Sequence, residues 1–86
     1  MPTICEFRGI KIYINYRDHH PPHFHANYGE YDCCISIESI ELIGGEMPNK
    51  QLKMLYGWVA LHQEELKENW YLAQQQQELF PIEPLR

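Results

Sequence analysis

Four histidines within seven residues mark the part of this sequence best equipped for chemistry. They lie in segment 16–25, which reads Tyr-Arg-Asp-His-His-Pro-Pro-His-Phe-His. A histidine has an unperturbed pKa of about 6.5, so it can take up or release a proton near neutral pH. Its imidazole nitrogens are also common metal ligands. The segment therefore favours acid/base chemistry or metal binding over other kinds of site.

Acid/base catalysis would divide its roles among five residues of this segment. His23 and His25 are the candidate acid/base groups. Arg17 is the candidate phosphate ligand, because a guanidinium binds phosphate oxygens and stabilises developing negative charge. Asp18 would orient His19. The reaction predicted from this set is phosphodiester or nucleotide chemistry.

His23 and His25 are also candidate ligands for a divalent metal ion. Residues two apart on a strand project from the same face, so their imidazoles can share one ion. A third ligand would have to come from His19, Asp18 or Cys34. Without an assured third ligand the metal signal is weak, and paired histidines on an exposed strand are often ordinary surface residues. Both alternatives stay open at this point.

The elements that must position these residues begin with an antiparallel β-meander. Runs of alternating or β-branched residues, separated by glycine and proline, predict its strands. These strands are 4–7, 10–16, 23–28, 31–37 and a short fifth at 41–43. In the second strand the inward residues are Ile10, Ile12, Ile14 and Tyr16. Segment 17–22 is predicted to be a loop, because its two prolines cannot donate to a sheet ladder.

A two-residue turn at Gly29-Glu30 fixes the register of the third and fourth strands. Glycine at the first central position is typical of a type II′ hairpin turn. The turn pairs Tyr28 with Tyr31, and an even register places Tyr13 opposite His25. The predicted outward face consists of Lys11, Tyr13, Asn15, His23, His25, Asn27, Asp32, Cys34 and Ser36. Arg17, Asp18 and His19 are expected to overhang one end of it.

A helix is predicted to cover the inward face of the sheet. From Asn49 onward apolar residues recur at spacings of three and four, which is the pattern of an amphipathic helix. This stripe contains Leu52, Leu55, Val59, His62, Leu66, Trp70 and Ala73. The predicted α+β fold is a single domain, 1–86, with a meander at 1–45, a long or bent helical part at 48–77 and an extended tail at 78–86.

Composition limits the class of protein. The net charge of −5 argues against non-specific nucleic-acid binding, although residues 1–29 carry three basic groups against two acidic ones. Three cysteines, two of them adjacent, make a poor disulfide framework and indicate a reduced, cytoplasmic protein. We expect no membrane segment and no signal peptide. A core this small would gain stability from a protein partner or a homo-oligomer.

These residues resemble a bacterial family known as domain of unknown function 4160. Its signature, Tyr-Arg-Asp-His-x-Pro-Pro-His-Phe-His-Ala, falls on residues 16–26, and His20 occupies the variable position. The resemblance covers nearly the whole chain. The other matching segments are Met1–Ile4, Tyr28-Gly29, Tyr31, Leu61-His62, Glu65-Leu66, Glu68–Trp70 and Ile82–Arg86.

The resemblance implies a biological context rather than a reaction. Some family members look like toxins of toxin–antitoxin pairs and are encoded next to a second small protein. The leading hypothesis is therefore a toxin-like component that an antitoxin-like partner neutralises. Carried over by residue, the signature falls on the candidate catalytic residues Arg17, Asp18, His19, His23 and His25. The alternatives are a non-enzymatic protein-binding module and a small metal-binding domain.

Overall fold

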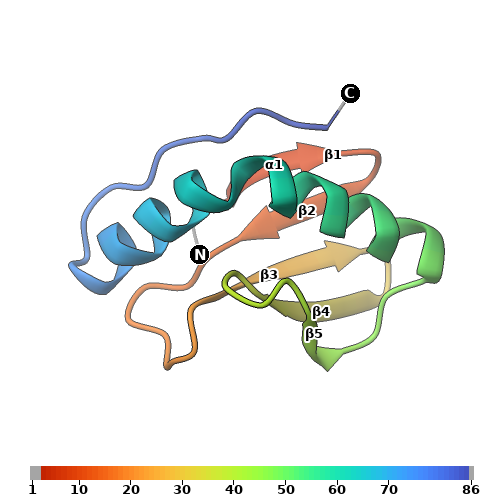
Figure 1. Cartoon of the computed structure of the whole chain (residues 1–86), viewed down its shortest axis with the longest axis horizontal. Helices are drawn as coiled ribbons and strands as arrows, with labels where there is room; N and C mark the ends of the chain where they lie inside the picture. Colours follow the sequence, from red (N-terminus) through yellow and green to blue (C-terminus); the bar gives the residue numbers. More distant parts are fainter. Residues whose placement is uncertain (1–2, 86) are drawn as a thin grey trace.

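The computed structural model describes residues 3–85, so residues 1, 2 and 86 of the predicted domain lie outside the described part. The elements in chain order are β1 (Thr3–Phe7), β2 (Ile10–Tyr13), β3 (His23–Tyr28), β4 (Tyr31–Ser36), β5 (Leu42–Gly45) and α1 (Asn49–Gln74). Figure 1 shows α1 lying across one face of the sheet. The predicted α+β class, a meander covered by one C-terminal helix, is confirmed.

The sheet is an antiparallel meander in which every strand pairs with its neighbour in sequence. The strand order is β1-β2-β3-β4-β5. Tyr28 pairs with Tyr31, and His25 pairs with Cys34 on one side and Tyr13 on the other, as the turn chemistry predicts. Gly29 has a φ of 59°, the left-handed region that a type II′ turn requires at this position.

The core lies between the inward face of the sheet and the apolar stripe of α1. Alternate residues of β2 and β4 are buried because successive side chains on a strand point to opposite faces. The fully buried side chains include Ile10, Ile12, Ile14, Phe24, Ile35, Leu55, Trp58, Val59 and Leu66. Burial of this apolar surface is the main force that holds the helix on the sheet.

The helix bends at one residue in its middle. His62 has φ −124° and ψ 24°, which are not helical values, while α1 continues on both sides of it. The sequence left open whether this helix is straight or bent, and the structure shows the bent form. The side chain of His62 contacts Glu65, with 2.6 Å between His62 Nδ1 and Glu65 Oε1. No helix among residues 3–85 is long and apolar enough to cross a membrane.

The C-terminal tail returns along the sheet and closes one of its edges. Figure 1 shows it running back past α1 towards β1. The amide of Ile82 donates to the carbonyl of Ile4 over 2.8 Å, and the Ile82 side chain is buried. The buried carboxamide of Asn69 bonds both the N–H and the carbonyl of Phe80. The tail therefore covers the outer edge of β1.

The main difference from the predicted elements is the end of the second strand. It was predicted to reach Tyr16, with that side chain inward, but β2 ends at Tyr13 and Tyr16 is 42% exposed. The chain leaves the ladder in a turn in which Arg17 adopts a φ of 55°. This expectation was wrong because alternation in sequence does not show where a strand loses its hydrogen-bonding neighbour. The fifth strand is also shifted, to Leu42–Gly45.

Candidate functional site

The loop after β2 is held against the end of α1. The backbone N–H of Arg17 donates to the carbonyl of Ala73 over 3.2 Å. The side-chain amide of Gln74 donates to the carbonyl of Asp18 over 3.0 Å. These two bonds fix the backbone on both sides of Asp18, so its carboxylate is directed back over the sheet.

Asp18 contacts both histidines of β3 through one oxygen. Its Oδ2 lies 3.1 Å from Nε2 of His23 and 2.9 Å from Nε2 of His25. Its Oδ1 accepts the backbone N–H of His19 over 2.9 Å. Asp18 is therefore the centre of the site. We call the four residues Asp18, His23, His25 and Cys34 the histidine cluster.

His23 shares the outward face with His25 but is not available to solvent. Its side chain is only 3% exposed, because the Trp70 ring lies 5.3 Å away between centroids. Its Nδ1 lies 2.7 Å from the carbonyl oxygen of Pro21, which can only accept, so Nδ1 carries a proton. His23, a predicted acid/base group of the outward face, is therefore buried in the structure.

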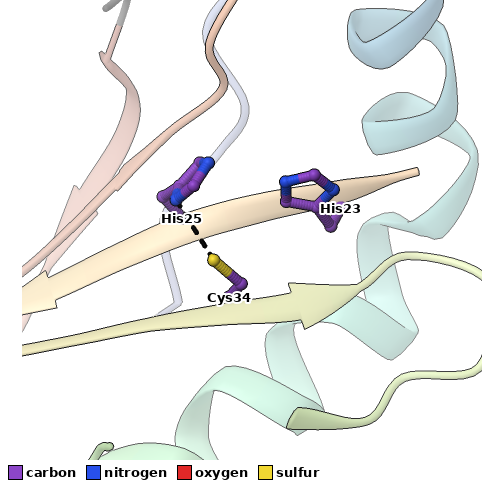
Figure 2. A group of neighbouring side chains, drawn as sticks. All are labelled: His23, His25 and Cys34. Atoms are coloured by element: carbon purple, nitrogen blue, oxygen red, sulfur yellow. Dashed lines mark hydrogen bonds between the residues drawn. The ribbon is translucent and has the colours of Figure 1, made fainter. Parts of the chain in front are cut away.

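His25 is the more exposed of the two histidines in the cluster. Its side chain is 20% exposed and stacks on Tyr13, with ring centroids 5.1 Å apart and planes 10° apart. Its Nδ1 lies 3.3 Å from Sγ of Cys34 on β4 (Figure 2). Because Nε2–H donates to Asp18, the lone pair of the ring is on Nδ1 and accepts the Cys34 thiol proton.

Asn15 adds a further polar contact to this ring. Its Nδ2 lies 3.3 Å from His25 Nε2, and its Oδ1 is buried with no hydrogen-bond partner within residues 3–85. Rotating the side-chain amide of Asn15 by 180° exchanges its oxygen and nitrogen. Oδ1 would then lie beside the Nε2–H of His25 and accept a hydrogen bond from it. Sequence analysis placed Asn15 on the outward face but gave it no role.

The surroundings of Asp18 lower the pKa of its carboxyl group. Burial raises its pKa, but the hydrogen bond from His25, the His19 amide and the positive potential of His23 together outweigh burial. The net result is a pKa below the ordinary value. Asp18 therefore remains an acceptor for the imidazoles at any pH near neutrality.

Acid is expected to destabilise the fold through this carboxyl. Because its pKa is lowered from the ordinary 3.8, its contribution is fully present above that value and is lost as the pH falls through the lower folded value. Urea unfolding of the wild type should therefore show a larger loss of stability between about pH 5 and about pH 2.5 than unfolding of Asp18→Asn. Equal losses in the two proteins would contradict this assignment.

The pKa of the Cys34 thiol is raised, whereas that of the Asp18 carboxyl is lowered. Burial raises its pKa, and the negative charges of Asp18 and Asp32 raise it further. The thiol is therefore protonated at neutral pH, and Cys34 is not an activated nucleophile by itself. His23, His25 and Cys34 nevertheless each offer one ligand atom within 4.8 Å of the others, so this group could hold a metal ion.

Two predicted site residues lie outside the cluster. The His19 side chain is 87% exposed, and its Nε2 is 3.9 Å from Asp18 Oδ1. Asp18 Oδ2 thus bonds His23 and His25, while the predicted contact of Asp18 with the His19 ring is the longer ion pair at Oδ1. Arg17 is exposed on the loop, so its guanidinium faces solvent beside the cluster rather than within it.

An open cleft of about 320 Å³ lies next to the cluster on the outward face. It is lined by Thr3, Lys11, Tyr13, Asn27 and Asp32. Asn27 pairs with Lys11 on one neighbouring strand and with Asp32 on the other. Asn27 is two residues beyond His25 on β3, so these three residues lie next to His25 on the same face of the sheet. The sequence places Lys11 on this face without assigning it a role, and the cleft identifies it as a cation near His25. A larger cleft between β5 and the start of α1 shares no residue with the cluster.

Comparison with known proteins places this site within one family. No curated protein and no solved structure matches the chain. The family model described as Domain of unknown function (DUF4160) matches residues 9–71. The match contains the whole histidine cluster, together with the Trp70 that covers His23. The resemblance seen in the sequence is confirmed over most of its length, and the chain belongs to the DUF4160 family.

Proposed function

We propose that this protein is the toxin-like component of a bacterial two-gene module and that His25 is its general base. The observation that carries the proposal is the 2.9 Å contact between Asp18 Oδ2 and His25 Nε2. A carboxylate bonded to one imidazole nitrogen fixes the tautomer and stabilises the imidazolium that forms when the other nitrogen takes a proton. The base would therefore act at Nδ1 of His25.

The chemistry we propose is proton transfer from a hydroxyl group that attacks a phosphodiester or nucleotide. The substrate hydroxyl would displace the Cys34 thiol from His25 Nδ1 and give its proton to that nitrogen. Its oxygen forms the new P–O bond as the P–O bond to the leaving oxygen breaks, and the leaving oxygen takes up a proton from solvent. Lys11 in the adjacent cleft and Arg17 on the loop supply positive charge for the phosphate. The net charge of −5 favours a nucleotide or a short strand over a long duplex.

The proposed partner is an antitoxin-like protein encoded nearby, and the proposed location is the cytoplasm. Support for the partner comes from the family resemblance and from the rim of the site. Tyr16 is 42% exposed where the loop meets the cluster, and an exposed aromatic side chain is typical of a protein contact. A partner covering this rim would also block access to His25.

Induced expression in a bacterial host tests the proposal. The wild type should arrest growth, and His25→Gln should not, because glutamine cannot take up the proton. His62→Gln is the matched control: its side chain is 18% exposed, close to the 20% of His25, but it lies on α1. Arrest that persists with a folded His25→Gln protein would rule out His25 as the base. Circular dichroism of each purified variant checks the fold.

A non-enzymatic protein-binding module is the second candidate function. The observation that favours it is the free edge of the sheet at β5, which pairs only with β4. Leu42 and Ile43 on this strand are 37% and 47% exposed. An extended segment of the partner could add a strand here. Two results together would favour this function. Neither the wild type nor His25→Gln would arrest growth, and the backbone amides of β5 would exchange more slowly in a complex with the product of the neighbouring gene.

A further inference from the structure

We propose that His23, His25 and Cys34 form a binding site for a soft divalent cation of the Zn²⁺ class. One ligand atom from each residue lies within 4.8 Å of the other two. Figure 2 shows the two imidazoles on β3 and the thiol on the adjacent strand β4. This inference goes beyond the proposed acid/base function and does not depend on it.

The sheet holds the three ligands close to the spacing that a tetrahedral metal requires. Bonds of about 2.0–2.1 Å to nitrogen and 2.3 Å to sulfur place adjacent nitrogen and sulfur ligands about 3.5 Å apart. The distance between Cys34 Sγ and His25 Nδ1 is already 3.3 Å. These two residues are directly paired across β3 and β4, so the ladder fixes their separation. The ligand atom of His23 lies within 4.8 Å of the other two.

Both histidines carry the outer hydrogen bonds that metal-bound histidines usually have. Metal ligation at one ring nitrogen is normally accompanied by donation from the other to a carboxylate or a backbone carbonyl. His25 Nε2 bonds the carboxylate of Asp18, which leaves Nδ1 for the metal. His23 Nδ1 bonds the carbonyl of Pro21, so a metal would bind His23 at Nε2 and take the place of its 3.1 Å contact with Asp18 Oδ2.

The charges of the cluster also suit a divalent cation. The metal would take Cys34 as a thiolate, releasing its proton to solvent. The carboxyl group of Asp18 lies 3.1 Å from His23 Nε2 and 2.9 Å from His25 Nε2, so a second acidic group stands beside the ion. Sulfur and imidazole ligands select Zn²⁺ or Co²⁺ over Mg²⁺, which prefers oxygen ligands. Three protein ligands leave one coordination position of a tetrahedral ion for water or substrate.

Metal binding and the proposed base role compete for the same atom. A metal on His25 Nδ1 occupies the lone pair that would accept the substrate proton. The metal-bound protein therefore cannot act through His25 as a base, while the metal-free protein can. The binding measurements involve no catalytic readout, so they test the metal site whatever the result of the growth test.

Titration of the untagged, reduced full-length protein with Co²⁺ tests the site. The wild type should bind one equivalent and develop a sulfur-to-cobalt charge-transfer band, which Zn²⁺ should remove by displacement. Cys34→Ala should lose the band. Cys33→Ala should keep it, because Cys33 points into the core from the same strand. Asp18→Asn should weaken binding by about 10–100-fold. A band that persists in Cys34→Ala, or the absence of stoichiometric binding to the wild type, would overturn the proposal.

A second measurement requires no variant. Saturating Zn²⁺ should slow alkylation of the Cys34 thiol in the wild-type protein, as located by peptide mass spectrometry. Mg²⁺ at the same concentration should leave the rate unchanged. Alkylation of Cys34 that proceeds equally fast with and without Zn²⁺ would show that the thiol is not a ligand.

Discussion

Replacing Trp70 with alanine is expected to lower the free energy of unfolding by about 3–5 kcal/mol. The Trp70 side chain is 5% exposed and packs on the His23 ring at one end of the helix–sheet interface. Removing the indole leaves a cavity that the strands and α1 can fill only in part. Small domains are stable by about 5–15 kcal/mol, so this loss is a large share of the total. Urea unfolding followed by circular dichroism measures it.

The same substitution should also damage the site. Without the indole, water reaches His23 and competes for its hydrogen bonds to Asp18 and Pro21. We therefore expect Trp70→Ala to lose growth arrest even at a temperature at which it stays folded. Tyr71→Ala is the control, because Tyr71 is adjacent on α1 but 63% exposed, and its stability should change by less than about 0.5 kcal/mol. Equal losses from the two substitutions would contradict the packing assigned to Trp70.

Replacing Asn69 with alanine is expected to lower the free energy of unfolding by about 2–4 kcal/mol. The Asn69 side chain is fully buried, and its carboxamide makes two bonds to the backbone of Phe80, of 2.9 and 3.0 Å. Truncation to alanine removes Oδ1 and Nδ2 of Asn69 together. The N–H and the carbonyl of Phe80 then lose these hydrogen bonds. The tail should then separate from β1, and the Ile82 amide, which donates to Ile4, should exchange with solvent much faster.

Hydrogen exchange followed by mass spectrometry or NMR measures this release. Glu68→Ala is the matched control, because Glu68 precedes Asn69 on the helix but is exposed. It should leave both the stability and the Ile82 exchange rate close to those of the wild type. Unchanged Ile82 protection in Asn69→Ala would mean that the burial of the Ile82 side chain alone holds the tail.

Local patterns in the sequence were sufficient to predict the architecture. The period of two in β2 and β4 shows which side chains face the core, and the turn at Gly29-Glu30 sets the pairing of His25 with Cys34. The spacing of three and four from Leu52 to Ala73 predicts the helix that covers the inward face. Each of these signals is contained within a short stretch of chain. That is why the strand order and the hairpin register could be read from the residues alone, while the bend at His62 could not.

The sequence also located the candidate site but not its internal arrangement. It brought His23, His25 and Cys34 to one face, because strand register decides the face on which a residue lies. The sequence placed both His23 and His25 on the outward face, and it predicted that Asp18 orients His19. In the structure one histidine is buried and the other accessible, and Asp18 contacts both. Alternation shows on which face a side chain lies and does not show what covers that face.

Contacts between distant parts of the chain determine the burial of each histidine and the partners of Asp18. Asp18 reaches both histidines because its backbone is held by Gln74, which is 56 positions away in sequence. His23 is buried because Trp70, at the far end of α1, packs against it. The sequence by itself determined which residues share a surface. Only the tertiary structure decided which histidine is buried, which is partly exposed, and that Oδ2 of Asp18 contacts both, since those properties depend on how the end of the helix docks against the loop.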